Sequence, residues 1–206
     1  MLPEFLIRFL IRLIARVSYR LNVAGQENIP PEGPAVLICN HVSFVDWLLI
    51  GAAVNRPVRF VIDYTFMRGW LLKWVLRSAK VIPIAGPRED PARLGEAYGE
   101  VSAELRRGGL VCIFPEGRIT FDGTLGPFKP GIMKILKQTP VPVVPMALHG
   151  LWGSTFSRMG GRALHRWPRR VRPPVELHIG KQLPPEVVKI ALLEERVRAL
   201  LGSGDS

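Results

Sequence analysis

Short apolar runs alternate with longer amphipathic segments along most of this chain, and this alternation constrains the fold more than any other feature. Strands are expected at 36–39, 59–62, 80–84, 110–114, 141–148 and 175–179, and helices at 45–54, 67–76, 92–107, 132–139 and 186–201. The alternation predicts an α/β fold, a single layered domain whose central, mostly parallel or mixed sheet is flanked by helices. Two prolines in 141–148 predict an edge or irregular strand, because proline cannot donate to a sheet ladder.

The length of 206 residues is enough for one domain with a real core and short for two. We expect residues 1–20 to form an amphipathic helix that precedes the domain, residues 21–201 to form the domain itself, and residues 202–206 to be a flexible tail. Cys39 and Cys112 lie inside apolar runs, so both are predicted to be buried free thiols, typical of a reducing compartment.

The N-terminal segment carries an arginine at every fourth position, with large apolar residues between them. Arg8, Arg12, Arg16 and Arg20 would form one drifting basic stripe on a helix. Arginines in the middle of the segment argue against a membrane-spanning helix. A helix in the plane of anionic headgroups is favoured, and an ordinary amphipathic helix packed on its own domain is the alternative.

A second segment combines tryptophan with basic residues. Trp70 and Trp74 lie in a predicted helix that also contains Arg68, Lys73 and Arg77. Tryptophans at headgroup depth with cations beside them would make this a second interfacial helix, whereas packing in the core is the alternative.

The net charge of +11 predicts an anionic partner, which could be nucleic acid, an acidic membrane surface or a phosphorylated substrate. No Asp or Glu occurs between Gly123 and Val175, a stretch rich in Lys and Arg. A nucleic-acid surface would be sought at 158–172, which contains Trp167. The arginines there do not follow any reading-helix pattern, so no nucleic acid is expected as a partner.

A histidine and an aspartate follow the first buried strand, in the pattern Asn40-His41-x-Ser43-x-x-Asp46. Five residues apart, the two side chains would diverge in one regular helix, so they meet only if His41 lies on the turn and Asp46 in the first helical turn. Asp46 could then accept the ring N–H of His41 and leave the other ring nitrogen as a base. A polar tie at a helix start is the alternative reading of this pair.

A second polar loop follows the strand at 110–114, with the pattern Phe114-Pro-Glu116-Gly117-Arg118-Ile-Thr120. The glycine permits a close backbone approach, and the arginine, the threonine hydroxyl and the nearby Lys129 are donors suited to phosphate. Ligands of α/β sheets bind at the carboxyl ends of the strands, so the two loops predict a base and a phosphate clamp side by side. No G-x-S-x-G elbow, P-loop, G-x-G-x-x-G or metal-ligand pattern is present.

The two motifs together resemble the glycerolipid acyltransferase family, which includes 1-acylglycerol-3-phosphate acyltransferases. The similarity covers about residues 21–181, with further blocks at Lys80–Ile84 and Val143–Ala147. The Glu-Gly-Arg-Ile-Thr form of the second motif is closest to bacterial 2-acylglycerophosphoethanolamine acyltransferase domains. That similarity continues through Phe156-Ser-Arg158 and Glu176-Leu-His-Ile179.

The resemblance implies residue roles. It makes His41 the general base and Asp46 its partner, while Glu116, Gly117 and Arg118 hold the acceptor's phosphate. Many relatives carry an arginine directly after the block at 80–84, whereas here Ala85-Gly86-Pro87 precedes Arg88.

The resemblance also implies the reaction and its setting. The acceptor would be a lysophospholipid, first of all 1-acylglycerol-3-phosphate, with lysophosphatidylethanolamine or another lysolipid as the alternative. An acyl-CoA or acyl-carrier protein would be the donor, with no cofactor, no metal and no acyl-enzyme. The enzyme would lie peripherally at an anionic membrane surface, on the cytoplasmic face of the cell membrane. A non-catalytic lipid-binding or nucleic-acid-binding domain is the alternative from another class.

Overall fold

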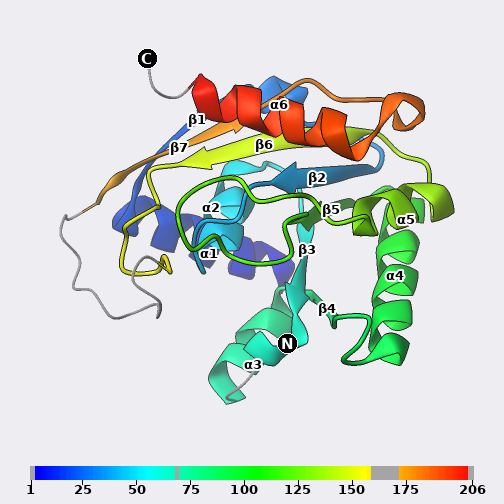
Figure 1. Cartoon of the computed structure of the whole chain (residues 1–206). Helices are drawn as coiled ribbons and strands as arrows, with labels where there is room; N and C mark the ends of the chain where they lie inside the picture. The colour runs from blue at the N-terminus through cyan, green and yellow to red at the C-terminus, as the bar shows by residue number, and fades with distance from the viewer. Residues whose placement is uncertain (1–2, 68–69, 159–171, 204–206) are drawn as a thin grey trace.

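A seven-stranded sheet runs through the middle of the molecule (Figure 1). The structure, a computed structural model, describes residues 3–67, 70–158 and 172–203. The strand order is β1-β7-β6-β2-β5-β3-β4, and every neighbouring pair is parallel except β6 and β7. The strands are β1 (Arg20–Ala24), β2 (Ala35–Cys39), β3 (Val58–Asp63), β4 (Ile82–Ile84), β5 (Leu110–Ile113), β6 (Val143–His149) and β7 (Pro174–Ile179).

Helices cover both faces of this sheet, as the sequence predicts. The α-helices are α1 (Glu4–Ser18), α2 (Asp46–Ala53), α3 (Trp70–Ser78), α4 (Pro91–Arg106), α5 (Gly131–Gln138) and α6 (Ile190–Gly202), and short 3₁₀ turns lie at η1 (Gln26–Asn28), η2 (Tyr64–Phe66) and η3 (Pro185–Val187). Alternate residues of β2 divide the core: Leu37 packs with α1 and α2, whereas Ile38 packs with α4, α5 and α6. The expected α/β domain is therefore confirmed.

The central strand β2 positions the candidate site. All five of its residues are buried, and it pairs in parallel with β5 on one side and β6 on the other. In register, Ile38 lies between Ile113 of β5 and Pro145 of β6. Because the three strands are parallel, the loops that follow them emerge at one edge of the sheet.

The expectation that the strand at 141–148 lies at an edge is wrong, since β6 pairs on both sides. The Pro145 carbonyl accepts a hydrogen bond from the Gly180 N–H, just beyond the end of β7. In a strand, the N–H and C=O of one residue point to the same side, so a backbone N–H at Pro145 would point toward β7. The hydrogen-bonded ladder between β6 and β7 stops at this position, so the missing N–H leaves no acceptor unpaired within the ladder. An interior strand tolerates proline at such a gap.

The two ends of the chain also differ from the prediction. The first helix ends at Ser18 rather than continuing to residue 20, and Arg20 begins β1, which pairs in parallel with β7. Alternate residues of β1 are exposed, so it lacks the apolar run by which the other strands were predicted. The closing helix is divided into η3 and α6, and α6 includes Gly202, while residues 204–206 lie outside the described chain.

Candidate active site

The predicted histidine–aspartate pair is formed. His41 lies on the turn after β2, and Asp46 is the first residue of α2, as the five-residue spacing requires. The His41 Nδ1 and Asp46 Oδ2 atoms are 2.8 Å apart. The same oxygen accepts the backbone N–H groups of Val42 and Ser43, at 2.8 and 3.0 Å. Asp46 is fully buried, so this one carboxylate holds both the imidazole ring and the turn that carries it.

The ring of His41 is held in one orientation from two directions. Asp46 binds its Nδ1 edge, and the ring of Phe114 stacks on its face with centroids 4.1 Å apart and planes at 15°. Because a carboxylate accepts, Nδ1 is the donor to Asp46, and in the neutral imidazole the lone pair then lies on Nε2. The side chain of His41 is 19% exposed, so this free nitrogen has access to a substrate. Phe114 was not predicted as a site residue. A phenylalanine at the end of a predicted strand has the same sequence pattern whether its ring packs in the core or stacks on a catalytic side chain.

Glu116 joins the two motif loops through main-chain hydrogen bonds. Its Oε1 atom accepts the His41 N–H at 2.8 Å, and its Oε2 atom accepts the Gly126 N–H at 2.9 Å. Burial raises the pKa of this carboxyl group, and the two N–H donors oppose that rise. Since both oxygens are engaged with the backbone, the geometry gives Glu116 a positioning role rather than direct contact with phosphate.

Replacing Glu116 with Gln is expected to separate the two loops. The amide keeps one acceptor, but its NH₂ group then faces a backbone N–H, either that of His41 or that of Gly126. We expect a loss of about 1–3 kcal/mol in the free energy of unfolding, measured by urea denaturation. Glu186→Gln, in η3, is the control. Equal stability of Glu116→Gln and wild type would contradict the bridging role.

Cationic side chains lie on the second loop, as predicted. Gly117 has a φ of +64°, and a Cβ there would come within 2.6 Å of the Lys129 Nζ atom. The glycine therefore lets Lys129 lie directly on the loop, and the Lys129 N–H donates to the Pro115 carbonyl at 2.8 Å. Arg118 and Lys129 are both exposed, so their charged groups are accessible to an anion.

Thr120 is placed differently from the expectation for a phosphate ligand. Its hydroxyl donates to the Asp122 carboxylate at 2.9 Å and accepts the Gly123 N–H at 3.1 Å. Hydrogen bonds from Thr124 and Thr120 lower the pKa of Asp122 to about 2. The backbone N–H of Thr120 donates to the His41 carbonyl at 2.9 Å, a second tie between the two motif loops. Thr120 thus shapes the loop, and its hydroxyl is directed into that loop.

The basic stripe of α1 lies at the edge of its exposed face. Arg8 and Arg12 donate to the backbone carbonyl and the side-chain oxygen of Asn55, beyond the end of α2. Arg16 is exposed. The face that α1 presents outward is instead apolar, with the following exposed residues: Phe5, Phe9, Leu10, Leu13, Ile14 and Val17.

Both tryptophans of α3 are exposed rather than packed in the core. Trp70 is 82% exposed and Trp74 is 46% exposed, whereas Leu76 of the same helix is buried against the α1/α2 side of the sheet. The exposure of both side chains contradicts the core-packing alternative. Within the described residues, no helix is long and apolar enough to cross a membrane.

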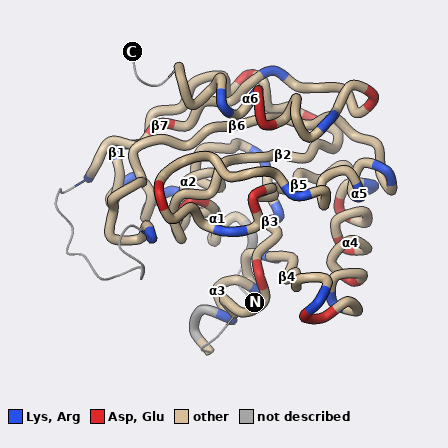
Figure 2. The backbone as a smooth tube through the Cα atoms, viewed as in Figure 1, with Lys and Arg blue, Asp and Glu red and all other residues tan. Residues whose placement is uncertain are grey.

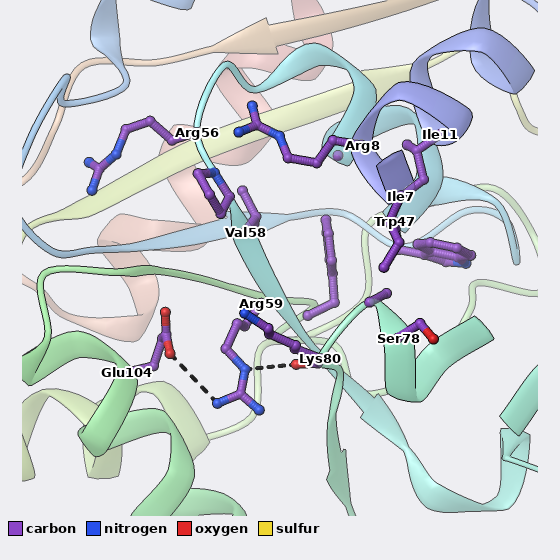
Figure 3. A pocket seen from close by; sticks show the side chains of 14 residues that line it. Ile7, Arg8, Ile11, Trp47, Arg56, Val58, Arg59, Ser78, Lys80 and Glu104 are labelled. Atoms are coloured by element: carbon purple, nitrogen blue, oxygen red, sulfur yellow. Dashed lines mark hydrogen bonds and ion pairs between the residues drawn. The ribbon is translucent and has the colours of Figure 1, made fainter. Parts of the chain in front are cut away.

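A cavity of about 100 Å³ lies between α1, α2, β3 and the end of α3 (Figure 3). Ile7 and Ile11 of α1 lie beside Trp47 of α2, and Arg59 reaches across to the Lys80 carbonyl and to Glu104. None of its lining residues belongs to either motif loop, so this cavity is separate from the histidine–aspartate pair.

Three other expectations fall elsewhere. Cys39 and Cys112 are confirmed as buried free thiols, and burial raises the pKa of both. Arg88 is exposed and follows β4, the edge strand. β3 lies between β4 and β5, the strand that carries the second motif loop. The segment considered for nucleic acid, 158–172, lies outside the described residues except for its two ends. Across the described parts of the chain, no group of three His, Cys, Asp or Glu residues could hold a metal ion.

The fold and the site define a class of protein: α/β domains that hold a histidine–aspartate pair next to cationic side chains at the carboxyl edge of the sheet. The profile of the acyltransferase family matches residues 20–149, which is more than half of the chain and contains both motifs. The chain belongs to the acyltransferase family.

Curated relatives and a solved structure agree with this membership. A chloroplastic 1-acyl-sn-glycerol-3-phosphate acyltransferase of Brassica napus is 31% identical over 69% of this chain and 42% of its own length. The lyso-ornithine lipid O-acyltransferase of Pseudomonas aeruginosa is 30% identical over 68% of this chain and 51% of its own length. The chain thus spans about half the length of these curated relatives.

The crystal structure of the 1-acyl-sn-glycerophosphate acyltransferase of Thermotoga maritima has the same fold. It superposes with a TM-score of 0.73 at 22% identity, covering 98% of this chain and 82% of that one.

Proposed function

We propose that this protein is a lysophospholipid O-acyltransferase, which transfers an acyl group from a thioester to a lysolipid hydroxyl. The observation that carries the proposal is His41, held by a buried carboxylate at Nδ1 and by a stacked ring on its face, with Nε2 free. This arrangement is a general base for a hydroxyl group. The relatives' names support acyl transfer to glycerol-based and other lysolipids.

In the proposed reaction, Nε2 of His41 takes the proton of the acceptor hydroxyl as its oxygen attacks the thioester carbonyl. A C–O bond forms, the C–S bond breaks, and the proton passes from Nε2 to the departing thiolate. Asp46 stabilises the imidazolium that exists between these two transfers. No side chain becomes acylated in this scheme. The donor is an acyl-CoA or an acyl-carrier protein.

The acceptor is proposed to be 1-acylglycerol-3-phosphate, which would make phosphatidate the product. The exposed cations Arg118 and Lys129, on the loop that Glu116 and Thr120 tie to His41, would hold its phosphate. Lysophosphatidylethanolamine and a lyso-ornithine lipid are the competing acceptors.

Thiol release from a long-chain acyl-CoA tests this proposal directly. Purified protein in detergent micelles receives each of the three acceptors separately, and an acyl-carrier protein replaces CoA in a parallel series. Acceptor-dependent release with lysophosphatidate as the preferred acceptor is the expected result. If none of the three acceptors stimulates thiol release in either series, the proposed function is wrong. If another acceptor is preferred, the headgroup assignment is wrong.

We also propose that α1 and α3 place the enzyme peripherally on an anionic membrane, on the cytoplasmic side. The outward apolar face of α1 and the exposed tryptophans of α3 belong to the same layer, and arginines line the edge of that face. Acidic residues, in contrast, recur along α4 and α6, over the opposite face of the sheet (Figure 2). Apolar area combined with flanking cations favours binding at a headgroup interface.

Leu13→Asp in α1 is expected to weaken co-sedimentation with anionic vesicles by about tenfold, because a charge enters the inserted apolar face. Val187→Asp is a matched control, since Val187 lies in η3 and both side chains are 46% exposed. Arginine reversal in α1 would be less specific, because Arg8 and Arg12 also bind Asn55. Equal retention of both variants on vesicles would contradict the anchoring role of α1.

A further inference from the structure

A third loop joins the two motif loops at the carboxyl edge of the sheet. It follows β6, the other parallel neighbour of β2, and so emerges next to the turn that carries His41. Its residues Phe156 and Ser157 pair with this turn, because the Phe44 N–H donates to the Phe156 carbonyl at 3.1 Å and Ser157 bridges Ser43. Ser157 is buried, and its hydroxyl donates to the Ser154 carbonyl at 2.8 Å. The loop is therefore fixed to the turn that holds the base.

The next residue of this loop, Arg158, shares one aromatic ring with Arg118. The Cζ atom of Arg158 lies 4.8 Å from the centroid of Phe121, and the Cζ atom of Arg118 lies 5.9 Å from the same centroid. Phe121 is 53% exposed, so the ring is a platform at the surface and not a core residue. Two guanidinium groups from loops far apart in the sequence thus meet over one ring.

Within the described parts of the chain, the cations at this position have no anionic partner. Among residues 3–67, 70–158 and 172–203, no carboxylate forms an ion pair with Arg118, Lys129 or Arg158. The neighbouring Asp122 is already engaged by Thr120 and Thr124. Two guanidinium groups over one ring, with Lys129 beside Gly117 on the loop that carries Arg118, form a concentration of positive charge that an external anion would neutralise.

We propose that Arg158 is a third binding residue for the acceptor's phosphate. The proposal rests on the proposed function, which it deepens by naming a further residue that binds the headgroup. Arg158 lies outside residues 20–149, the part of the chain that the family profile matches.

Arg158→Ala tests this assignment by kinetics. We expect the KM for lysophosphatidate to rise by about tenfold or more, with kcat little changed. Arg196→Ala, an exposed arginine of α6 without an ion pair in the described structure, is the matched control. Phe121→Leu should raise the same KM, and the double variant should show less than the product of the two effects, because the ring and the guanidinium act together.

A binding measurement keeps the proposal independent of turnover. Isothermal titration of a short-chain, monomeric lysophosphatidate without any donor should give an affinity about tenfold weaker for Arg158→Ala than for wild type. If wild type transfers no acyl group but shows this difference in affinity, the proposed function fails and Arg158 remains a phosphate ligand. An unchanged KM and an unchanged affinity in Arg158→Ala would overturn the assignment.

Discussion

Replacing His41 with Ala is expected to lower acceptor-dependent thiol release by about a thousandfold, because general-base catalysis by a positioned side chain contributes about 10² to 10⁴ in rate. The loss should appear in kcat, because Arg118, Lys129 and Arg158 would still hold the acceptor. Stopped assays of product formation with saturating lysophosphatidate would measure it.

A second histidine provides a matched control for this experiment. His178 of β7 also pairs with a carboxylate, that of Glu176, and its side chain is 18% exposed against 19% for His41. Since His178 is on a strand that does not carry a motif loop, His178→Ala should retain activity. Full activity of His41→Ala, with a melting temperature equal to that of wild type, would show that another group removes the proton.

The second large effect is expected for Asp46→Asn, again about a thousandfold in kcat. If the amide oxygen stays on His41 Nδ1, the NH₂ group occupies the buried Oδ1 position, where the described residues offer no hydrogen-bond partner. If the amide turns, its NH₂ group faces His41 Nδ1 and forces the proton onto Nε2, the atom that must act as a base. The first arrangement buries an NH₂ group without a partner and leaves the imidazolium without a counter-charge, and the second removes the base. Kinetics and a thermal melt together would characterise the variant.

The same position has a structural role that Asp46→Ala would reveal. Without an acceptor, the buried N–H groups of Val42 and Ser43 lose their partner, and we expect unfolding to become easier by about 3 kcal/mol. Asp63→Ala is a suitable control because Asp63 also binds a following turn, through the N–H and hydroxyl of Thr65, but is not buried. A stability of Asp46→Ala equal to that of wild type would contradict this role.

The features of the site that the sequence predicts are those that depend on short separations. The position of His41 on a turn and of Asp46 at the start of α2 follows from a buried run, a five-residue spacing and the helix that comes after. That the second loop lies beside it follows from the general rule for strand ends in α/β sheets. These inferences need only local pattern and chain order, and the structure agrees with both.

The features that the sequence does not predict depend on partners far along the chain. β1 is half exposed and is recognisable only through its pairing with β7, about 150 residues later. β6 resembles an edge strand until the gap in the ladder at Pro145 is seen. A threonine hydroxyl turned into its own loop and two arginines over Phe121 are side-chain arrangements, which spacing alone does not determine.

The short length of α2 has a mechanical consequence. Its eight residues span about 12 Å, with Asp46 at one end and, just past the other, Asn55, which receives hydrogen bonds from Arg8 and Arg12 of α1. α1 also packs along α2. A rod of two turns therefore connects the residue that Arg8 and Arg12 of α1 bind to the carboxylate that binds the imidazole ring. If α1 is displaced against the sheet, we expect the position of Asp46, and with it the orientation of the His41 ring, to change.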